Sequence, residues 1–153
     1  MTPYNRFYKC VHFELHELVD PVTLKTLGDA CWSLFDPYLL STMDRIRERY
    51  GVVIISNNWK LNGPYKFRGF RPSDCKEGAE LSSHRRGTAC DFDVYGKTAE
   101  EVRRDILDNK EHIDFMFINR IELGVSWVHI DVINVPTRIQ TFSKAVASLG
   151  GNS

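Results

Sequence analysis

The sequence contains no long hydrophobic run. No stretch of its 153 residues approaches the roughly 18 apolar residues that a membrane span needs. The N-terminal stretch also lacks the apolar core of a signal peptide. These absences predict a protein that is made in the cytoplasm without a signal peptide and that has no membrane partner.

An excess of one charge and closely spaced cysteine pairs are also missing. Lys plus Arg and Asp plus Glu number 20 each, so no overall electric field favours nucleic acid as a partner. The four cysteines are scattered without a C-x-x-C pair. This scatter predicts reduced thiols and excludes a zinc ribbon or a disulfide framework.

What remains is the composition of an ordinary globular protein. With 42% hydrophobic and 12% aromatic residues, the chain can bury a core without disulfides. No internal repeat, low-complexity tract or linker divides it. We therefore expect a single domain over residues 1–153.

Hydrophobic periodicity and end signals predict three helices. The clearest covers residues 37–50, where Asp36 can cap the first turn and Gly51 ends the pattern. A second, near residues 99–109, begins with a capping-box sequence. A third is expected near residues 139–149.

Four strands are expected, near residues 52–56, 88–94, 117–122 and 127–133. The last two are separated by a short loop, which predicts a hairpin. Residues 60–83 have little periodicity and form a long irregular segment of the kind that often carries function. The fold class is therefore α+β, with a small antiparallel sheet and helices packed on one of its faces.

Two segments supply side chains that suit a metal ion. One contains His84 and Asp91, and the other contains His129 and Asp131. Catalytic zinc takes three nitrogen or oxygen ligands from the protein and keeps a water as the fourth. If the two segments are neighbouring strands, their alternation places Asp91, His129 and Asp131 on one polar face.

At these positions the sequence resembles the D-alanyl-D-alanine carboxypeptidase family of zinc peptidases. That family includes phage L-alanyl-D-glutamate endopeptidases and shares its fold with the hedgehog signalling domain. Its first motif, Ser-x-His-x-x-Gly-x-Ala-x-Asp, is matched by Ser82, His84, Gly87, Ala89 and Asp91. Its second, aromatic-x-His-x-Asp, is matched by Trp127, His129 and Asp131.

The resemblance implies a zinc hydrolase. One Zn²⁺ per chain would be held by His84, Asp91 and His129, in a cleft on the sheet face opposite the helices. The implied substrate is a peptide of bacterial peptidoglycan, cut by a carboxypeptidase or an endolysin-type endopeptidase. A bacteriophage enzyme of this kind acts at the cell wall after release from the cell or when carried in a phage particle.

The family's upstream element, Ser/Thr-Gly-aromatic-Arg, is matched in part by residues 69–71, with Arg68 in place of the small residue. In the family this arginine helps to hold the substrate. The resemblance therefore implies a substrate-binding role for Arg71.

The catalytic carboxylate departs from the family pattern. Many members carry Glu or Asp three residues before the second zinc histidine, where this chain has Ser126. Glu122 is the nearest replacement. If Glu122 pairs with Trp127 across the hairpin, both share a face with His129, but a loop one residue different in length would point Glu122 away.

Two questions stay open at the level of sequence. Asp93 and Asp131 either orient the ligand histidines from outside the metal centre or face water. The protein is either an active peptidase or a catalytically inactive zinc-containing binding or structural module, for example in a phage virion assembly. The serine at position 126 and the lack of a separate wall-binding domain permit the second reading.

Overall fold

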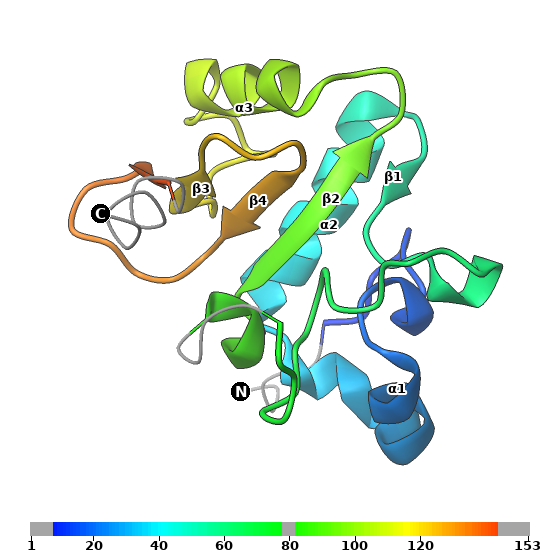
Figure 1. The fold of residues 1–153 in the computed structure, drawn as a ribbon. Coiled ribbons are helices and arrows are strands. Elements are labelled where there is room, and N and C mark those ends of the chain that lie inside the picture. The colour runs from blue at the N-terminus through cyan, green and yellow to red at the C-terminus, as the bar shows by residue number, and fades with distance from the viewer. Residues whose placement is uncertain (1–7, 78–81, 144–153) are drawn as a thin grey trace, which may run out of the picture.

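The computed structural model describes residues 8–77 and 82–143, and Figure 1 shows how the elements are arranged. Three α-helices and five strands make up the regular structure, together with four short 3-10 helices labelled η. In chain order the elements are η1 (Leu15–Glu17), α1 (Pro21–Leu27), η2 (Gly28–Leu34), α2 (Pro37–Tyr50), β1 (Ile54–Ile55), η3 (Trp59–Leu61), η4 (Ser83–Arg86), β2 (Ala89–Val94), α3 (Ala99–Asp108), β3 (Arg120–Glu122), β4 (Val128–Asp131) and β5 (Gln140–Phe142).

The five strands form one sheet in the order β1-β2-β4-β3-β5. The pairs β1/β2, β2/β4 and β3/β4 are antiparallel, whereas β5 runs parallel to β3. The expected α+β class is therefore confirmed, and the expectation of a purely antiparallel sheet is wrong. The sheet is mixed because the chain after β4 crosses over and returns beside β3.

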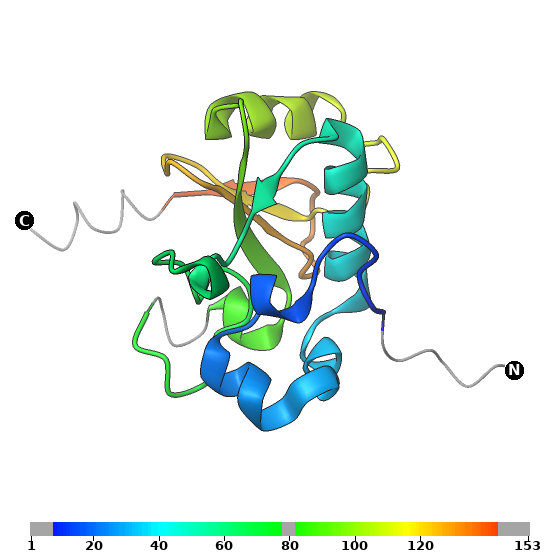
Figure 2. The ribbon, with the colours of Figure 1, turned by 90° about the vertical axis from the view of Figure 1, so that its right-hand side faces the viewer.

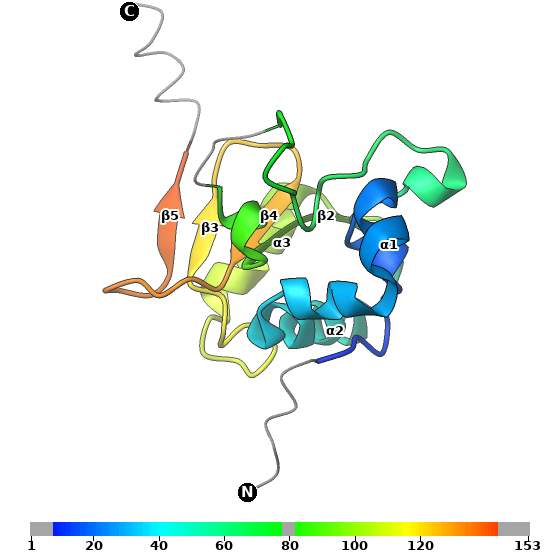
Figure 3. The same cartoon turned by 90° about the horizontal axis from the view of Figure 1, so that it is seen from below.

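One face of the sheet belongs to the hydrophobic core. Phe92 of β2 and Ile130 of β4 are fully buried there, and they cluster with apolar side chains of α2 and α3 such as Met43 and Ile106. Figures 2 and 3 show α2 running along one side of the sheet. Because side chains alternate along a strand, the polar residues of β2 and β4 face the opposite side.

The predicted ends of α2 and α3 are confirmed. Asp36 accepts a hydrogen bond from the backbone N–H of Tyr38 at 2.8 Å, and Gly51 ends α2 with a left-handed φ of 60°. Thr98 and Glu101 form the reciprocal capping box at the start of α3. These ends depend on neighbouring residues alone, which is why the sequence predicts them well.

Two expected elements differ in the structure. The strand near residues 52–56 is confined to Ile54–Ile55, and Val53 is 58% exposed rather than buried. The prediction of a helix near residues 139–149 is wrong for Gln140–Phe142, which form β5. Residues 144–149 lie outside the described part of the chain. Gln140–Phe142 form a strand because β3 supplies them with hydrogen-bond partners at the edge of the sheet.

No helix in residues 8–77 and 82–143 combines the length and the apolar character that crossing a membrane would require.

Gly87 joins η4 to β2 at a point of very close backbone approach. Its φ is +69°, and a Cβ atom there would collide with the carbonyl oxygen of Leu34. We predict that Gly87→Ala lowers the free energy of unfolding by about 3 kcal/mol or more, measured by urea denaturation. The matched control is Gly96→Ala, where φ is also positive but the space is open, and where about 1–2 kcal/mol is expected. Equal losses in the two variants would contradict the collision.

Candidate metal centre

The polar face of the sheet brings two predicted ligands together directly. In the β2/β4 ladder Asp91 lies opposite His129, and Ala89 lies opposite Asp131. Directly paired residues place their side chains on the same face, at close range. The register therefore sets the imidazole of His129 against the carboxylate of Asp91.

The third predicted ligand, His84, comes from η4, which packs against β2. Ser82 caps this short helix by accepting a hydrogen bond from the His84 N–H at 3.3 Å, and Gly87 ends it in the left-handed region. The His84 carbonyl accepts a bond from Arg71 N at 3.2 Å. The serine and glycine of the first motif thus form the turn that carries the histidine.

The three ligand atoms form a small triangle. His84 Nε2 lies 3.2 Å from both His129 Nδ1 and Asp91 Oδ1, and His129 Nδ1 lies 2.7 Å from Asp91 Oδ1. Tetrahedral zinc with bonds near 2.0–2.1 Å separates its ligands by about 3.3 Å. Two of the three separations are close to that value and the third is shorter, and the group could hold a metal ion.

The outward nitrogens of both histidines have partners that turn the inward nitrogens toward each other and toward Asp91. His84 Nδ1 donates to the carbonyl of Gly69 at 2.8 Å, which puts the proton on Nδ1 and the lone pair on Nε2. His129 Nε2 lies 3.4 Å from Asp131 Oδ2. Such outer contacts are typical of metal-binding histidines, because they fix the ring and its tautomer.

The electrostatics of the triangle place a proton on His129 when no metal is bound. Burial lowers the pKa of His84. Burial also opposes a charge on His129, but the carboxylates of Asp131 and Asp91 outweigh it and raise the His129 pKa to about 9. Burial alone would raise the pKa of Asp91, yet the two imidazoles hold it well below its usual range. A metal ion must therefore displace a proton from His129.

Asp131 is fully buried, so the interpretation that its side chain faces water is wrong. Besides His129, its Oδ2 lies 3.4 Å from Ser83 Oγ and 3.6 Å from Arg120 Nε. Arg120 is opposite Asp131 in the β3/β4 ladder. Ser83 and Arg120 were not among the predicted site residues, because only the packing of η4 and the β3/β4 register bring them to Asp131.

Asp93 is partly exposed to water and pairs with an arginine. Its side chain is 40% exposed and binds Arg68 Nη1 at 2.7 Å. No hydrogen bond joins Asp93 to a ligand histidine among the described residues. Its link to the site is indirect, because the Arg68 carbonyl accepts the N–H of Asp91 at 2.8 Å.

Glu122 lies beside the triangle, although the hairpin register differs from the expected one. Ile121 pairs with Ile130, so Glu122 lies opposite His129 rather than Trp127. The shift is two residues, and the side chain therefore keeps the expected face. Glu122 is only 2% exposed, its Oε2 lies 3.9 Å from His129 Nδ1, and its Oε1 has no hydrogen-bond partner among the described residues.

Arg71 lines a cleft of about 460 Å³ that reaches Asp91. Its Nε donates to the Phe67 carbonyl at 2.9 Å, and its Nη2 lies 3.5 Å from Asp91 Oδ2. The other walls include residues that sequence reasoning did not select, namely Tyr65, Lys66, Phe67 and Ser126. The aromatic and basic run just before Arg71 was the signal that could have identified the first three.

Comparisons of the chain with protein-family models, with curated proteins and with solved structures found no match. The chemistry of the site is therefore argued from the residues themselves.

We predict that the protein binds one divalent transition-metal ion per chain and that His84→Ala weakens this binding by more than about 100-fold. Chelator competition with Zn²⁺ or Co²⁺ measures the affinity. His112→Ala is the matched control, since the His112 side chain is half exposed and contacts Asp114 instead of the triangle. Metal binding that survives His84→Ala would place the ion elsewhere.

The proton on His129 gives metal binding a defined pH dependence. Because the imidazolium cannot coordinate a metal, apparent affinity should rise by about tenfold per pH unit as pH increases, up to the His129 pKa of about 9. Competition titrations at several pH values below that limit measure the slope. An affinity that stays constant with pH would show that no proton is displaced.

Proposed function

We propose that this protein is a zinc-dependent peptidase that hydrolyses a peptide bond in the stem peptides of bacterial peptidoglycan. The observation that carries the proposal is the buried triangle of His84, Asp91 and His129 at the edge of a cleft lined by Arg71. We also assign the chain to the D-alanyl-D-alanine carboxypeptidase family and its hedgehog-like fold. The two sequence motifs and the placement of the triangle away from the core helices support this assignment.

Zinc is the metal that the ligand set suits best. Two imidazole nitrogens and one carboxylate oxygen are typical zinc ligands, and a site with three protein ligands keeps its fourth position open for water. Zinc held by His84, Asp91 and His129 would lower the pKa of a bound water toward about 7 and would polarise a substrate carbonyl.

The protein side chains supply the remaining steps. Glu122 accepts the proton of the attacking water on its unpartnered Oε1 and passes it to the leaving amine. Its burial, with only 2% of the residue exposed, keeps bulk water from competing for that proton. Arg71 holds a substrate carboxylate or the developing oxyanion with the guanidinium donors that Phe67 and Asp91 do not occupy.

The substrate class rests on the family resemblance. Peptidoglycan stem peptides carry free carboxylates, which the cleft can meet with Arg71 and Lys66. The proposed place of action is the cell wall, which the protein would reach after release from the cell or in a phage particle. The balance of 20 basic and 20 acidic residues supports neither nucleic acid nor an anionic membrane as an alternative partner.

A second function is favoured by one observation. Ser126 occupies the position of the family's usual catalytic carboxylate and lines the cleft. A protein that kept the metal centre and lost hydrolysis would serve as a binding or structural module, for example in a phage virion.

Glu122→Gln separates the two functions. In the peptidase, we predict that this change lowers the release of new amino termini from purified peptidoglycan by at least about 100-fold, while zinc content stays at one per chain. Glu111→Gln is the control, because the Glu111 side chain is 84% exposed and pairs with Arg138.

The outcomes point in different directions. Zinc without hydrolysis in the unmodified protein would support the module. Full activity in Glu122→Gln would remove Glu122 from the mechanism but keep the peptidase. An unmodified protein that binds no zinc would rule out both functions.

A further inference from the structure

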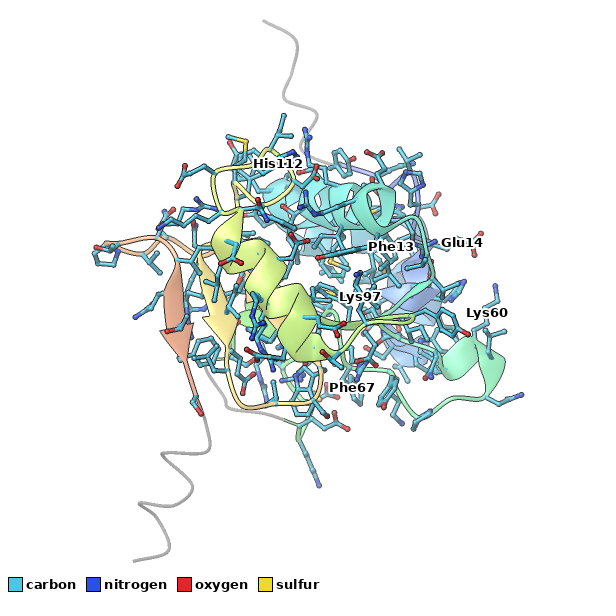
Figure 4. The ribbon with its side chains drawn as sticks, turned by 90° about the horizontal axis from the view of Figure 1, so that it is seen from above. Phe13, Glu14, Lys60, Phe67, Lys97 and His112 are labelled. Carbon is cyan, nitrogen blue, oxygen red and sulfur yellow. The ribbon has the colours of Figure 1, made fainter. Side chains whose placement is uncertain are left out.

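The cleft beside the metal centre has an aromatic wall. Tyr65, Phe67 and Trp127 line it together with Arg71 and Asp91. Tyr65 is 38% exposed, whereas Phe67 and Trp127 are half-buried. Figure 4 labels Phe67 beside the loop between β3 and β4, which ends in Trp127. Aromatic side chains from two distant segments therefore meet across one small space.

The backbone of Tyr65 is held in place by the loop that carries it. Its N–H donates to Asn58 Oδ1 at 2.8 Å. Its carbonyl accepts the backbone N–H groups of Asn58 at 2.9 Å and Trp59 at 3.2 Å. Gly63 completes the loop, because a Cβ atom at this position would collide with the Asn58 side chain. Tyr65 thus projects from a closed, hydrogen-bonded loop.

The guanidinium of Arg68 stacks on one face of the Tyr65 ring. The guanidinium carbon of Arg68 lies 3.7 Å from the ring centroid. The same guanidinium donates to Asp93 Oδ2 at 2.7 Å and to the Ile55 carbonyl at 3.3 Å. Because the Arg68 carbonyl also accepts the N–H of Asp91, the ring is tied to the strand that carries a metal ligand. Arg68 thus covers one face of the ring, and the Tyr65 side chain as a whole stays 38% exposed beside the cleft.

The peptide part of the proposed substrate does not explain this wall. Stem peptides are built from alanine, glutamate and a diamino acid, and none of these offers a large flat apolar surface. The sugar to which the stem peptide is attached does offer such a surface, because the C–H groups of a pyranose ring form an apolar face that packs on an aromatic ring. Resting on the proposed function, we infer that the Tyr65 ring binds the N-acetylated sugar of the peptidoglycan strand.

This placement limits which bond is cut. Tyr65 and Asp91 line the same cleft of about 460 Å³. A sugar packed on the Tyr65 ring would therefore lie beside the metal centre. The bond presented to the metal centre would then be one near the sugar end of the stem peptide.

A sugar probe without a stem peptide tests the site independently of hydrolysis. The probe is the methyl glycoside of N-acetylmuramic acid with its carboxylate blocked as the methylamide. Binding is followed by NMR shifts in the aromatic side chains. We predict that Tyr65→Ala weakens binding by about fivefold and that Tyr65→Phe, which keeps the ring, stays within about twofold of the unmodified protein. Tyr95→Ala is the matched control, because Tyr95 is 72% exposed and does not line the cleft.

Each outcome is informative. Loss of binding in Tyr65→Ala alone supports the sugar site, even if the protein hydrolyses no peptidoglycan and the proposed function fails. The inference is overturned if the unmodified protein does not bind the probe, if Tyr65→Ala binds it as well as the unmodified protein, or if Tyr95→Ala loses as much affinity.

Discussion

The cross-strand pairing of Asp91 with His129 is the constraint on which the rest of the site depends. A shift of one residue in either strand would turn these side chains into the core and bring apolar ones to the metal centre. Such a shift is opposed by Phe92 and Ile130, which are fully buried on the other face and would become exposed. The hydrophobic core thereby sets the geometry of the polar triangle, including the 2.7 Å contact between its carboxylate and imidazole.

Gathering acidic groups on a buried surface has an energetic cost. Asp91, Asp131 and Glu122 are each at most 5% exposed, and carboxyl groups removed from water need partners. The first two find His129, but one oxygen of Glu122 has no partner among the described residues. A divalent cation would add positive charge where these groups converge, so metal binding should also stabilise the fold.

The cleft has two walls that are built in different ways. The metal wall comes from regular strands and η4, whose positions follow from sheet pairing and capping. Two residues of the aromatic wall, Tyr65 and Phe67, come from the irregular segment that follows η3. There Asn58 Oδ1 accepts the Tyr65 N–H, and Arg68 stacks on the Tyr65 ring. Arg68 also links the loop to the sheet through Asp93. An irregular segment can thus be as well positioned as a strand.

The sequence by itself determined the features that depend on neighbouring residues. These are the ends of α2 and α3, the turn that carries His84, and the ordered histidine and aspartate positions that the fold brings together. The tertiary structure alone decided features that depend on distant partners. They include the parallel strand β5, the place of Glu122 opposite His129, and the pairing of Asp93 with Arg68. The physical reason is that strand register and ion pairing are set by packing between segments far apart in the chain.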